Sequence, residues 1–195
     1  GVLGWHSLLQ SKNLPYISAV STGLTNAIFS KMEKDSIKAS QDLANEYGEP
    51  EWCLGTGMRN THRLAIAPTV SNSILSGSYS PGRTPYRANV FTQKTAKGTF
   101  EVRNPYLVKL LKSKDKDNEE TWRIIKDSKG SVQTLDFLSD DEKEVFLNFE
   151  EINQMELVRQ ASVAQQYIDQ SQSLNLCFPY GVKPKFVFDV HLEAW

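Results

Sequence analysis

A run of short polar side chains follows an apolar segment in the first half of the chain. Residues 64–67 are apolar, Pro68 interrupts them, and the apolar pair at 74–75 comes after the polar run. The polar side chains belong to Thr69, Ser71, Asn72 and Ser73. We expect a buried strand over 64–67, because proline cannot donate to a sheet ladder and ends it. A strand that leads into a helix presents unpaired N–H groups and the positive end of the helix dipole, so this pattern predicts a phosphate site.

A plainer interpretation stays open for the same turn. Thr69 or Ser71 would then be an ordinary N-cap, whose hydroxyl accepts a hydrogen bond from the first helical turn. The local pattern alone favours this second interpretation. Two arginines, Arg83 and Arg87, lie in the Ser-, Pro- and Gly-rich loop over 78–88, but loop arginines are usually only solvated.

Other residue types that could carry chemistry form no cluster. His6, His62 and His191 are scattered without the spacing of zinc ligands, so we predict no metal site. The acidic residues 140–142 open a helix, and the helix dipole explains them without catalysis. No Gly-rich phosphate loop is present, and Cys177 lies in a predicted strand, where thiols are usually inert.

Composition describes a globular protein of ordinary domain size. The chain has 195 residues, 39% hydrophobic and 23% charged, with a formal net charge of −1. This charge gives no support for nucleic-acid binding, and no apolar run is long enough to cross a membrane. Cys53 and Cys177 have no partner motif, and we expect reduced thiols in a cytoplasmic protein.

Helices must dominate the fold that positions the polar turn. Hydrophobic periodicity predicts helices over 3–12, 119–126 and 183–195, and a further helix that starts at 152. Capping residues predict three more: one from Ser21 or Thr22 to 47, one over 105–111 after the cap Asn104, and one that starts at 139 with a capping box. Residues 90–95 and 99–103 predict a β-hairpin around a turn at 96–98, and 174–178 predict a further strand. The class is α/β, and these residues alone predict one phosphate-binding turn in it.

Three segments resemble the large subunit of class I ribonucleotide reductase. They are the stretch from Arg59 to Ser71, the hairpin and helix start at 89–107, and Tyr-Ile-Asp-Gln-Ser-Gln-Ser-Leu-Asn at 167–175. The last is the most specific, because it is similar to a near-terminal signature of the family. The similarity covers essentially the whole chain, in order and at compatible spacing.

The resemblance implies the fold and the role of the polar turn. The family folds as a ten-stranded α/β barrel, and residues 1–195 would form a single partial domain, the C-terminal half of that barrel with a β-hairpin insertion. The loop at 68–73 would hold the substrate diphosphate, with hydroxyl donors from Thr69 and Ser71. Backbone N–H groups would come from Val70, Ser71 and Asn72, and Ser73 belongs to the same predicted site. The family reduces ribonucleoside diphosphates to deoxyribonucleotides, the precursors of DNA.

Departures from the family pattern limit what the chain could do alone. The radical-forming cysteine and the redox cysteine pair of the family lie earlier in its chain, and its tandem tyrosines lie later. The sequence Asn175-Leu176-Cys177 resembles the family's loop with the radical-forming cysteine. It follows the signature at 167–175, however, where the family has an ordinary strand, so we assign no catalytic residue. Thr84 stands where the family often has a glutamate before proline, which leaves the role of the 78–88 loop open.

The resemblance therefore indicates a fragment of a reductase large subunit. Its partners would be a ribonucleoside diphosphate, the remainder of the large subunit and a radical-generating small subunit, with a thiol reductant and with no cofactor in this chain. The isolated chain should be inactive, and its uncovered strand edges predict self-association. One rival is a non-catalytic remnant that serves as a binding or assembly module. The other, a generic barrel enzyme that binds phosphate, is disfavoured by the signature at 167–175.

Overall fold

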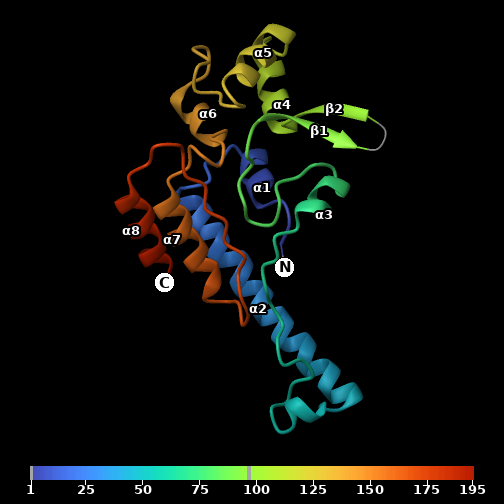
Figure 1. Ribbon diagram of the computed structural model, residues 1–195. Helices are drawn as coiled ribbons and strands as arrows, with labels where there is room; N and C mark the ends of the chain where they lie inside the picture. The colour runs from blue at the N-terminus through green and yellow to red at the C-terminus, as the bar shows by residue number, and fades with distance from the viewer. Residues whose placement is uncertain (1, 96–97) are drawn as a thin grey trace.

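The computed structural model describes residues 2–95 and 98–195 as a helix-rich chain with one β-hairpin (Figure 1). The elements are α1 (Trp5–Ser11), α2 (Ala19–Tyr47), η1 (Glu51–Cys53), α3 (Val70–Leu75), β1 (Val90–Thr95), β2 (Gly98–Arg103), α4 (Pro105–Ser113), α5 (Glu119–Asp127), α6 (Asp140–Val145), α7 (Gln154–Gln165) and α8 (Pro184–Ala194). The expected predominance of helices and the hairpin are confirmed. Within the described residues, no helix is both long and apolar enough to cross a membrane.

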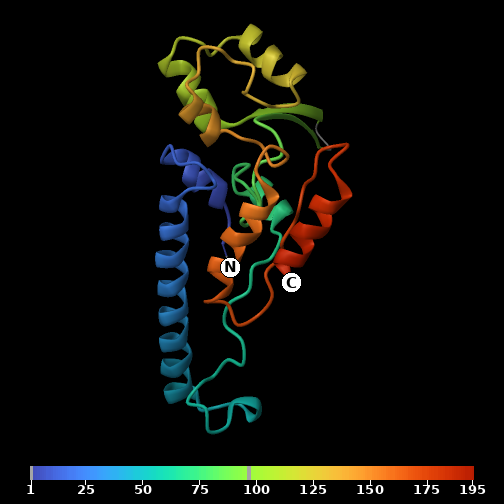
Figure 2. The ribbon, with the colours of Figure 1, turned by 90° about the vertical axis from the view of Figure 1, so that its left-hand side faces the viewer.

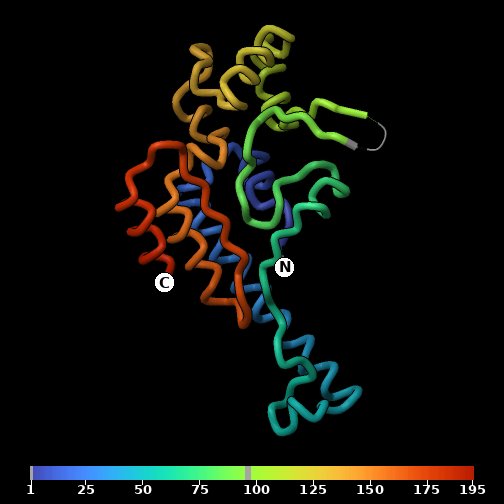
Figure 3. The backbone as a smooth tube through the Cα atoms, in the orientation of Figure 1, coloured from blue at the N-terminus to red at the C-terminus, as the bar shows by residue number. Residues whose placement is uncertain are grey.

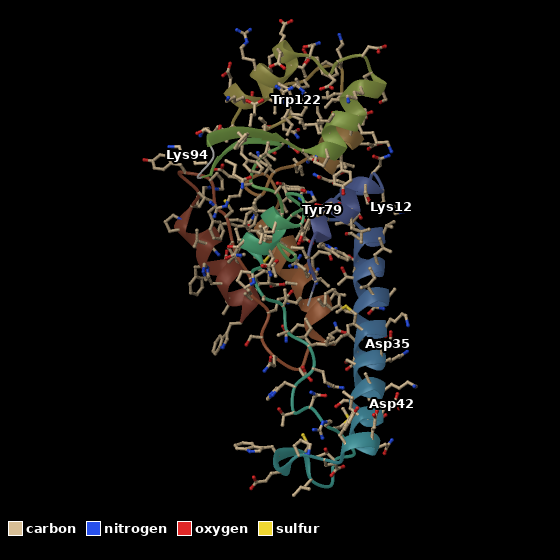
Figure 4. All side chains as sticks on the ribbon, turned by 90° about the vertical axis from the view of Figure 1, so that its right-hand side faces the viewer. Lys12, Asp35, Asp42, Tyr79, Lys94 and Trp122 are labelled. Carbon is tan, nitrogen blue, oxygen red and sulfur yellow. The ribbon has the colours of Figure 1, made fainter. Side chains whose placement is uncertain are left out.

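Three helices form the layer behind the polar turn. α7 packs between α2 on one side and α8 on the other, as Figure 2 shows. The far half of α2 and the η1 turn extend beyond this layer (Figure 1). There the side chains of Asp35 and Asp42 point into solvent (Figure 4). The polar turn therefore lies near the packed end of α2, away from its free end.

The start of α2 differs from the sequence prediction. Ser18 is the N-cap, in place of Ser21 or Thr22. Its Oγ accepts a hydrogen bond from the Ser21 N–H at 3.0 Å, and Ser21 Oγ accepts one from the Ser18 N–H at 3.1 Å. This is a capping box with serine in the position that usually carries glutamate or glutamine, which is why the pattern was missed.

Other predicted caps are confirmed. Asn104 caps α4 by accepting a hydrogen bond from the Tyr106 N–H, with Pro105 in the first helical position. Ser139 and Glu142 form the capping box that begins α6. These caps are local in sequence, and so a sequence pattern is enough to find them.

Residues 89–146 form a unit that we call the hairpin lobe, built from β1, β2, α4, α5 and α6. The strands pair antiparallel, with Val90 opposite Arg103. The buried side chains of the lobe are Val90, Leu107, Leu111, Trp122, Ile125, Val132, Leu135, Leu138, Val145 and Phe146. Trp122 lies among them at the top of the lobe (Figure 4), 2% exposed. The predicted turn at 96–98 falls largely on residues 96–97, outside the described residues.

Two predicted strands are not formed as such. Residues 64–67 and 174–178 contain no regular strand, and the described parallel pairing is one isolated bridge between Ile66 and Gln172. A strand needs a ladder of hydrogen bonds with a neighbour, and residues 64–66 share only a few such bonds with residues 170–173. Leu64 and Ile66 are buried, as the apolar pattern predicts, but Ala67 is exposed and no residue of 174–178 is buried. The pattern also could not supply the neighbouring strands.

Candidate functional site

The polar turn is approached by an extended segment that runs beside the signature at 167–175. Figure 3 shows the two traces side by side. The Ile66 N–H donates to the Ser171 carbonyl at 3.2 Å, and the Ser173 N–H donates to the Ile66 carbonyl at 2.8 Å. We call residues 62–69 and 168–175 the bridge segments. Together they fix the direction in which the chain enters the turn.

Asp169 holds the two bridge segments together. Its carboxylate accepts hydrogen bonds from the Leu64 N–H at 2.8 Å, from the Arg63 N–H and from Arg63 Nε at 3.0 Å. Partial burial alone would raise the pKa of Asp169. The N–H groups of Leu64 and Arg63 and the guanidinium outweigh that effect, so the pKa lies below its ordinary value. The Asp169 carboxylate therefore joins the two bridge segments, and we call this contact the clamp. No local sequence pattern indicates this role.

The turn itself places Thr69 in the left-handed region, with φ 46°. Thr69 precedes α3, but its side chain makes no capping hydrogen bond, so the N-cap interpretation is wrong for its hydroxyl. Thr69 Oγ1 is buried and has no hydrogen-bond partner in the described part of the chain. Buried polar atoms are usually satisfied, so this orphaned hydroxyl is a notable feature of the turn.

The N–H groups that follow Thr69 fall into two sets. Those of Val70, Ser71 and Asn72 have no partner among the described residues. The Ser73 N–H donates to the Thr69 carbonyl at 2.9 Å, and Ser73 Oγ donates to the Val70 carbonyl at 2.6 Å. Ser73 therefore uses both of its donors within the turn, whereas the three residues before it offer theirs outward.

The 78–88 loop packs closely against the turn at Gly82. A Cβ on this glycine would lie 3.0 Å from the Ala67 carbonyl oxygen and 3.5 Å from Thr69 Oγ1, and φ is 52°. Only glycine fits such an approach and such a backbone conformation without strain. In the sequence, Gly82 is only one of the residues that predict a loop over 78–88.

A groove of about 540 Å³ opens between α3, the 78–88 loop and the start of β1. Its lining residues are Pro68, Val70, Ser73, Ile74, Ser78, Tyr79, Pro81, Thr84, Pro85, Tyr86, Arg87, Phe91, Phe149 and Asn175. Tyr79 lies beside α3 in Figure 4 and close to the start of α1, where a Cβ on Gly4 would be 3.5 Å away. The volume suits a small organic ligand. Of the predicted site residues, Val70 and Ser73 line this groove.

The two loop arginines have different environments. Arg83 is only 6% exposed, and its Nη2 donates to the Gln160 carbonyl at 3.0 Å. Its guanidinium lies 5.3 Å from the ring centres of both Trp5 and Phe29. Burial lowers the pKa of Arg83, and the neighbouring Tyr16 opposes this shift only in part. Arg83 is therefore a structural cation, and the expectation of a solvated side chain is wrong for it; Arg87 is exposed and lines the groove.

Histidine and cysteine side chains make no second site in the described residues. No group of three or more His, Cys, Asp or Glu side chains is placed there to hold a metal ion. His6 is fully buried, whereas His62 and His191 are exposed. Both cysteines are free. Burial and the nearby Glu150 raise the pKa of Cys177, against the opposing charge of Arg87, so the thiol is not activated.

Comparisons with known proteins show which family the chain resembles. The family model described as "Ribonucleotide reductase, barrel domain" matches residues 51–195. A ribonucleoside-diphosphate reductase large subunit of Invertebrate iridescent virus 3 is 40% identical over 198 residues, covering 100% of this chain and 31% of that relative. The corresponding subunit of Danio rerio is 28% identical over 229 residues, covering 100% of this chain and 28% of that relative.

A solved structure extends the comparison to three dimensions. The class Id ribonucleotide reductase alpha subunit of Actinobacillus ureae superposes with a TM-score of 0.92 at 42% identity, and the match covers 100% of this chain and 35% of that one. The chain thus spans about a third of the length of the relatives it matches. The resemblance drawn from the sequence, and the expectation of part of an α/β barrel, are confirmed.

Proposed function

Because this chain belongs to the ribonucleotide reductase barrel-domain family, we propose that it forms the part of a ribonucleoside-diphosphate reductase large subunit that holds the diphosphate of the substrate. The observation that carries this proposal is the outward set of N–H groups at Val70, Ser71 and Asn72, next to a groove whose described lining residues include no acidic side chain. The complete enzyme would reduce ribonucleoside diphosphates to deoxyribonucleotides by radical chemistry. This chain would supply binding and orientation.

In this proposal the backbone N–H groups bind phosphate oxygens at the N-terminus of α3. Hydrogen bonds to a charged group of this kind contribute roughly 1.5–3 kcal/mol each. The Ser71 hydroxyl adds a donor. The buried Thr69 hydroxyl, which has no partner, turns about χ1 to meet the ligand. Ser73 acts through the turn that its two internal hydrogen bonds stabilise.

The remaining chemistry belongs to residues outside this chain. We propose that residues 1–195 are a partial domain, the C-terminal half of the barrel, which works in the cytoplasm with the remainder of the large subunit. A radical-generating small subunit and a thiol reductant complete the enzyme. Purified chain should therefore give no turnover of a ribonucleoside diphosphate, even with small subunit and reductant supplied; turnover would refute this division of labour.

A second candidate function is a folded module that binds or assembles without catalysis. Large apolar side chains that are more than half exposed favour it, and among them are Val70, Leu75, Phe100, Phe188 and Leu192. The remainder of the subunit would cover such surfaces in the complete enzyme, and self-association would cover them in the isolated chain. A monodisperse monomer by light scattering at high concentration would count against self-association of the isolated chain.

The test of the proposed site is a titration of the labelled chain with adenosine diphosphate, followed by amide NMR. Shifts should centre on Val70, Ser71 and Asn72, and the double variant Thr69→Ala, Ser71→Ala should bind more weakly. Ser30→Ala removes a hydroxyl from α2, away from the groove, and should leave binding unchanged. Shifts centred elsewhere, or equal binding by the double variant, would make the assignment wrong.

A further inference from the structure

The charge lining the groove comes from one residue. Among the described residues that line it, Arg87 alone has an ionised side chain, and none is an aspartate or a glutamate. Four aromatic residues, Tyr79, Tyr86, Phe91 and Phe149, also line this groove. A single cation together with aromatic faces suits a ligand that carries both an anion and a flat ring. This combination is the chemistry of a nucleotide rather than of a simple anion.

Arg87 has no counter-charge of its own. It makes no hydrogen bond and no ion pair within 4.0 Å in the described part of the chain. By contrast, Arg63, Arg103 and Arg159 are each paired with a carboxylate. A guanidinium that is unpaired and faces a groove retains all of its donors for a ligand.

The backbone on both sides of Arg87 is firmly held. The Tyr86 N–H donates to His6 Nδ1 at 3.0 Å, and the Tyr86 carbonyl accepts from the Phe149 N–H at 2.8 Å. On the other side, Asn89 Nδ2 donates to the Gly130 and Phe146 carbonyls. Arg87 therefore projects from a fixed point at the edge of the groove, which reduces the entropy lost when it binds a ligand.

Thr84 keeps this part of the groove free of negative charge. Its Oγ1 accepts a hydrogen bond from Asn175 Nδ2 at 3.3 Å, and both residues line the groove. A glutamate at position 84 would place a carboxylate in the same groove as Arg87. The two side chains would then attract each other, and the charge offered to a ligand would fall.

We propose that Arg87 is a second phosphate-binding residue of this groove, which binds the diphosphate of the same nucleoside diphosphate as α3, and that Thr84 leaves its charge free to do so. The inference rests on the proposed function, because it takes the same groove as the substrate site. It adds a residue that contacts the ligand and a position that determines how strongly it does so. The aromatic residues then face the nucleoside part of the ligand.

The experiment uses the full chain and three probes: adenosine diphosphate, inorganic diphosphate and adenosine. Arg87→Gln should raise the Kd of both phosphate-bearing probes by about tenfold, the loss expected for one charge-assisted contact, and should leave adenosine binding unchanged. Arg87→Lys should retain part of the affinity that Arg87→Gln loses, because lysine keeps the positive charge but lacks the planar guanidinium with its paired N–H donors. Thr84→Glu should weaken both phosphate-bearing probes as Arg87→Gln does. Arg123→Gln on α5, another exposed arginine without an ion pair, is the matched control.

Each remaining outcome would overturn the inference. Equal affinity of Arg87→Gln and Arg123→Gln would show a solvated arginine only. An equal loss for adenosine would show a structural defect in the groove rather than a lost phosphate contact. If the Thr69, Ser71 double variant loses binding while Arg87→Gln keeps it, the inference fails and the proposed function stands. If neither variant changes binding, both fail.

Discussion

The hairpin lobe and the bridge segments are built in opposite ways. The lobe draws its core from residues close together in sequence, and Leu107, Leu111, Ile125 and Val132 in it are completely buried. The bridge segments come from positions about a hundred residues apart and share an isolated bridge, a charged clamp and a smaller cluster around Phe29 and Ile66. The site thus lies on the part of the molecule with fewer local contacts.

This difference indicates that global stability and ligand binding depend on different regions of the molecule. Regions with few buried contacts open at lower free energy than well-packed cores, and binding segments are commonly drawn from them. We expect the lobe to determine the global stability of the chain, and the bridge segments to respond to ligand and to small local changes.

The largest expected effect tests the lobe with two neighbouring isoleucines on α5. Ile125 is 0% exposed and Ile124 is 37% exposed. Ile125→Ala should lower the free energy of unfolding by about 2–5 kcal/mol, because it leaves a cavity, whereas Ile124→Ala should cost about 1 kcal/mol or less. Urea unfolding followed by circular dichroism measures both. Equal losses would show that the lobe core is not packed as described.

The second prediction concerns buried His6, which contacts Tyr86 of the groove and Val145 of the hairpin lobe. His6 Nδ1 accepts the Tyr86 N–H, so the neutral ring carries its proton on Nε2. Burial lowers the pKa of His6 to about 3, against a smaller opposing hydrogen bond to the Val145 carbonyl. In the unfolded chain the His6 imidazole has its ordinary pKa of about 6.5. Below that pH the unfolded chain therefore binds a proton that the folded protein does not bind. Stability should therefore fall as the pH drops from 6.5 toward 3, by about 1.4 kcal/mol per pH unit.

His6→Asn keeps an acceptor for the Tyr86 N–H and removes the titrating ring. Its unfolding midpoint in urea should depend less on pH between 6.5 and 4 than that of the wild type. His62→Asn, at an exposed imidazole, should retain the wild-type dependence. The same slope in all three proteins would remove His6 from the explanation.

A smaller effect is expected at the clamp between the bridge segments. Asp169→Asn retains size but loses the charge that holds the Leu64 N–H and Arg63, at a cost of about 1–3 kcal/mol. The loss should appear as faster amide exchange at Ile66 and Ser173, with little change in the lobe. Asp42→Asn, at an exposed pair with Lys38, should change neither. Uniformly faster exchange throughout Asp169→Asn would show that the clamp has no local role.

The sequence predicted the local parts of the molecule better than the assembled ones. The Asn104 and Ser139 caps and the hairpin pairing depend on residues within a few positions of one another, and they were correct. The helix after the polar turn was also predicted correctly, because an apolar run followed by proline and hydroxyl residues is a local pattern. Phosphate binding at that turn stays a prediction.

What the sequence could not provide depended on contacts across the chain. Nothing in the pattern separates Arg83, buried between Trp5 and Phe29, from the exposed Arg87. The clamp at Asp169 requires knowing that residue 64 lies beside it. The predicted strands failed for the same reason, since a strand is defined by its neighbours.

The most direct test of the account is amide hydrogen exchange of the chain with and without adenosine diphosphate. If the groove and the turn bind the diphosphate, exchange should slow in residues 64–75 and 168–175. The core of the hairpin lobe, including Leu111 and Ile125, should exchange at the same rate in both conditions. Protection that appears in the lobe and not in the bridge segments, or no protection at saturating ligand, would contradict the account.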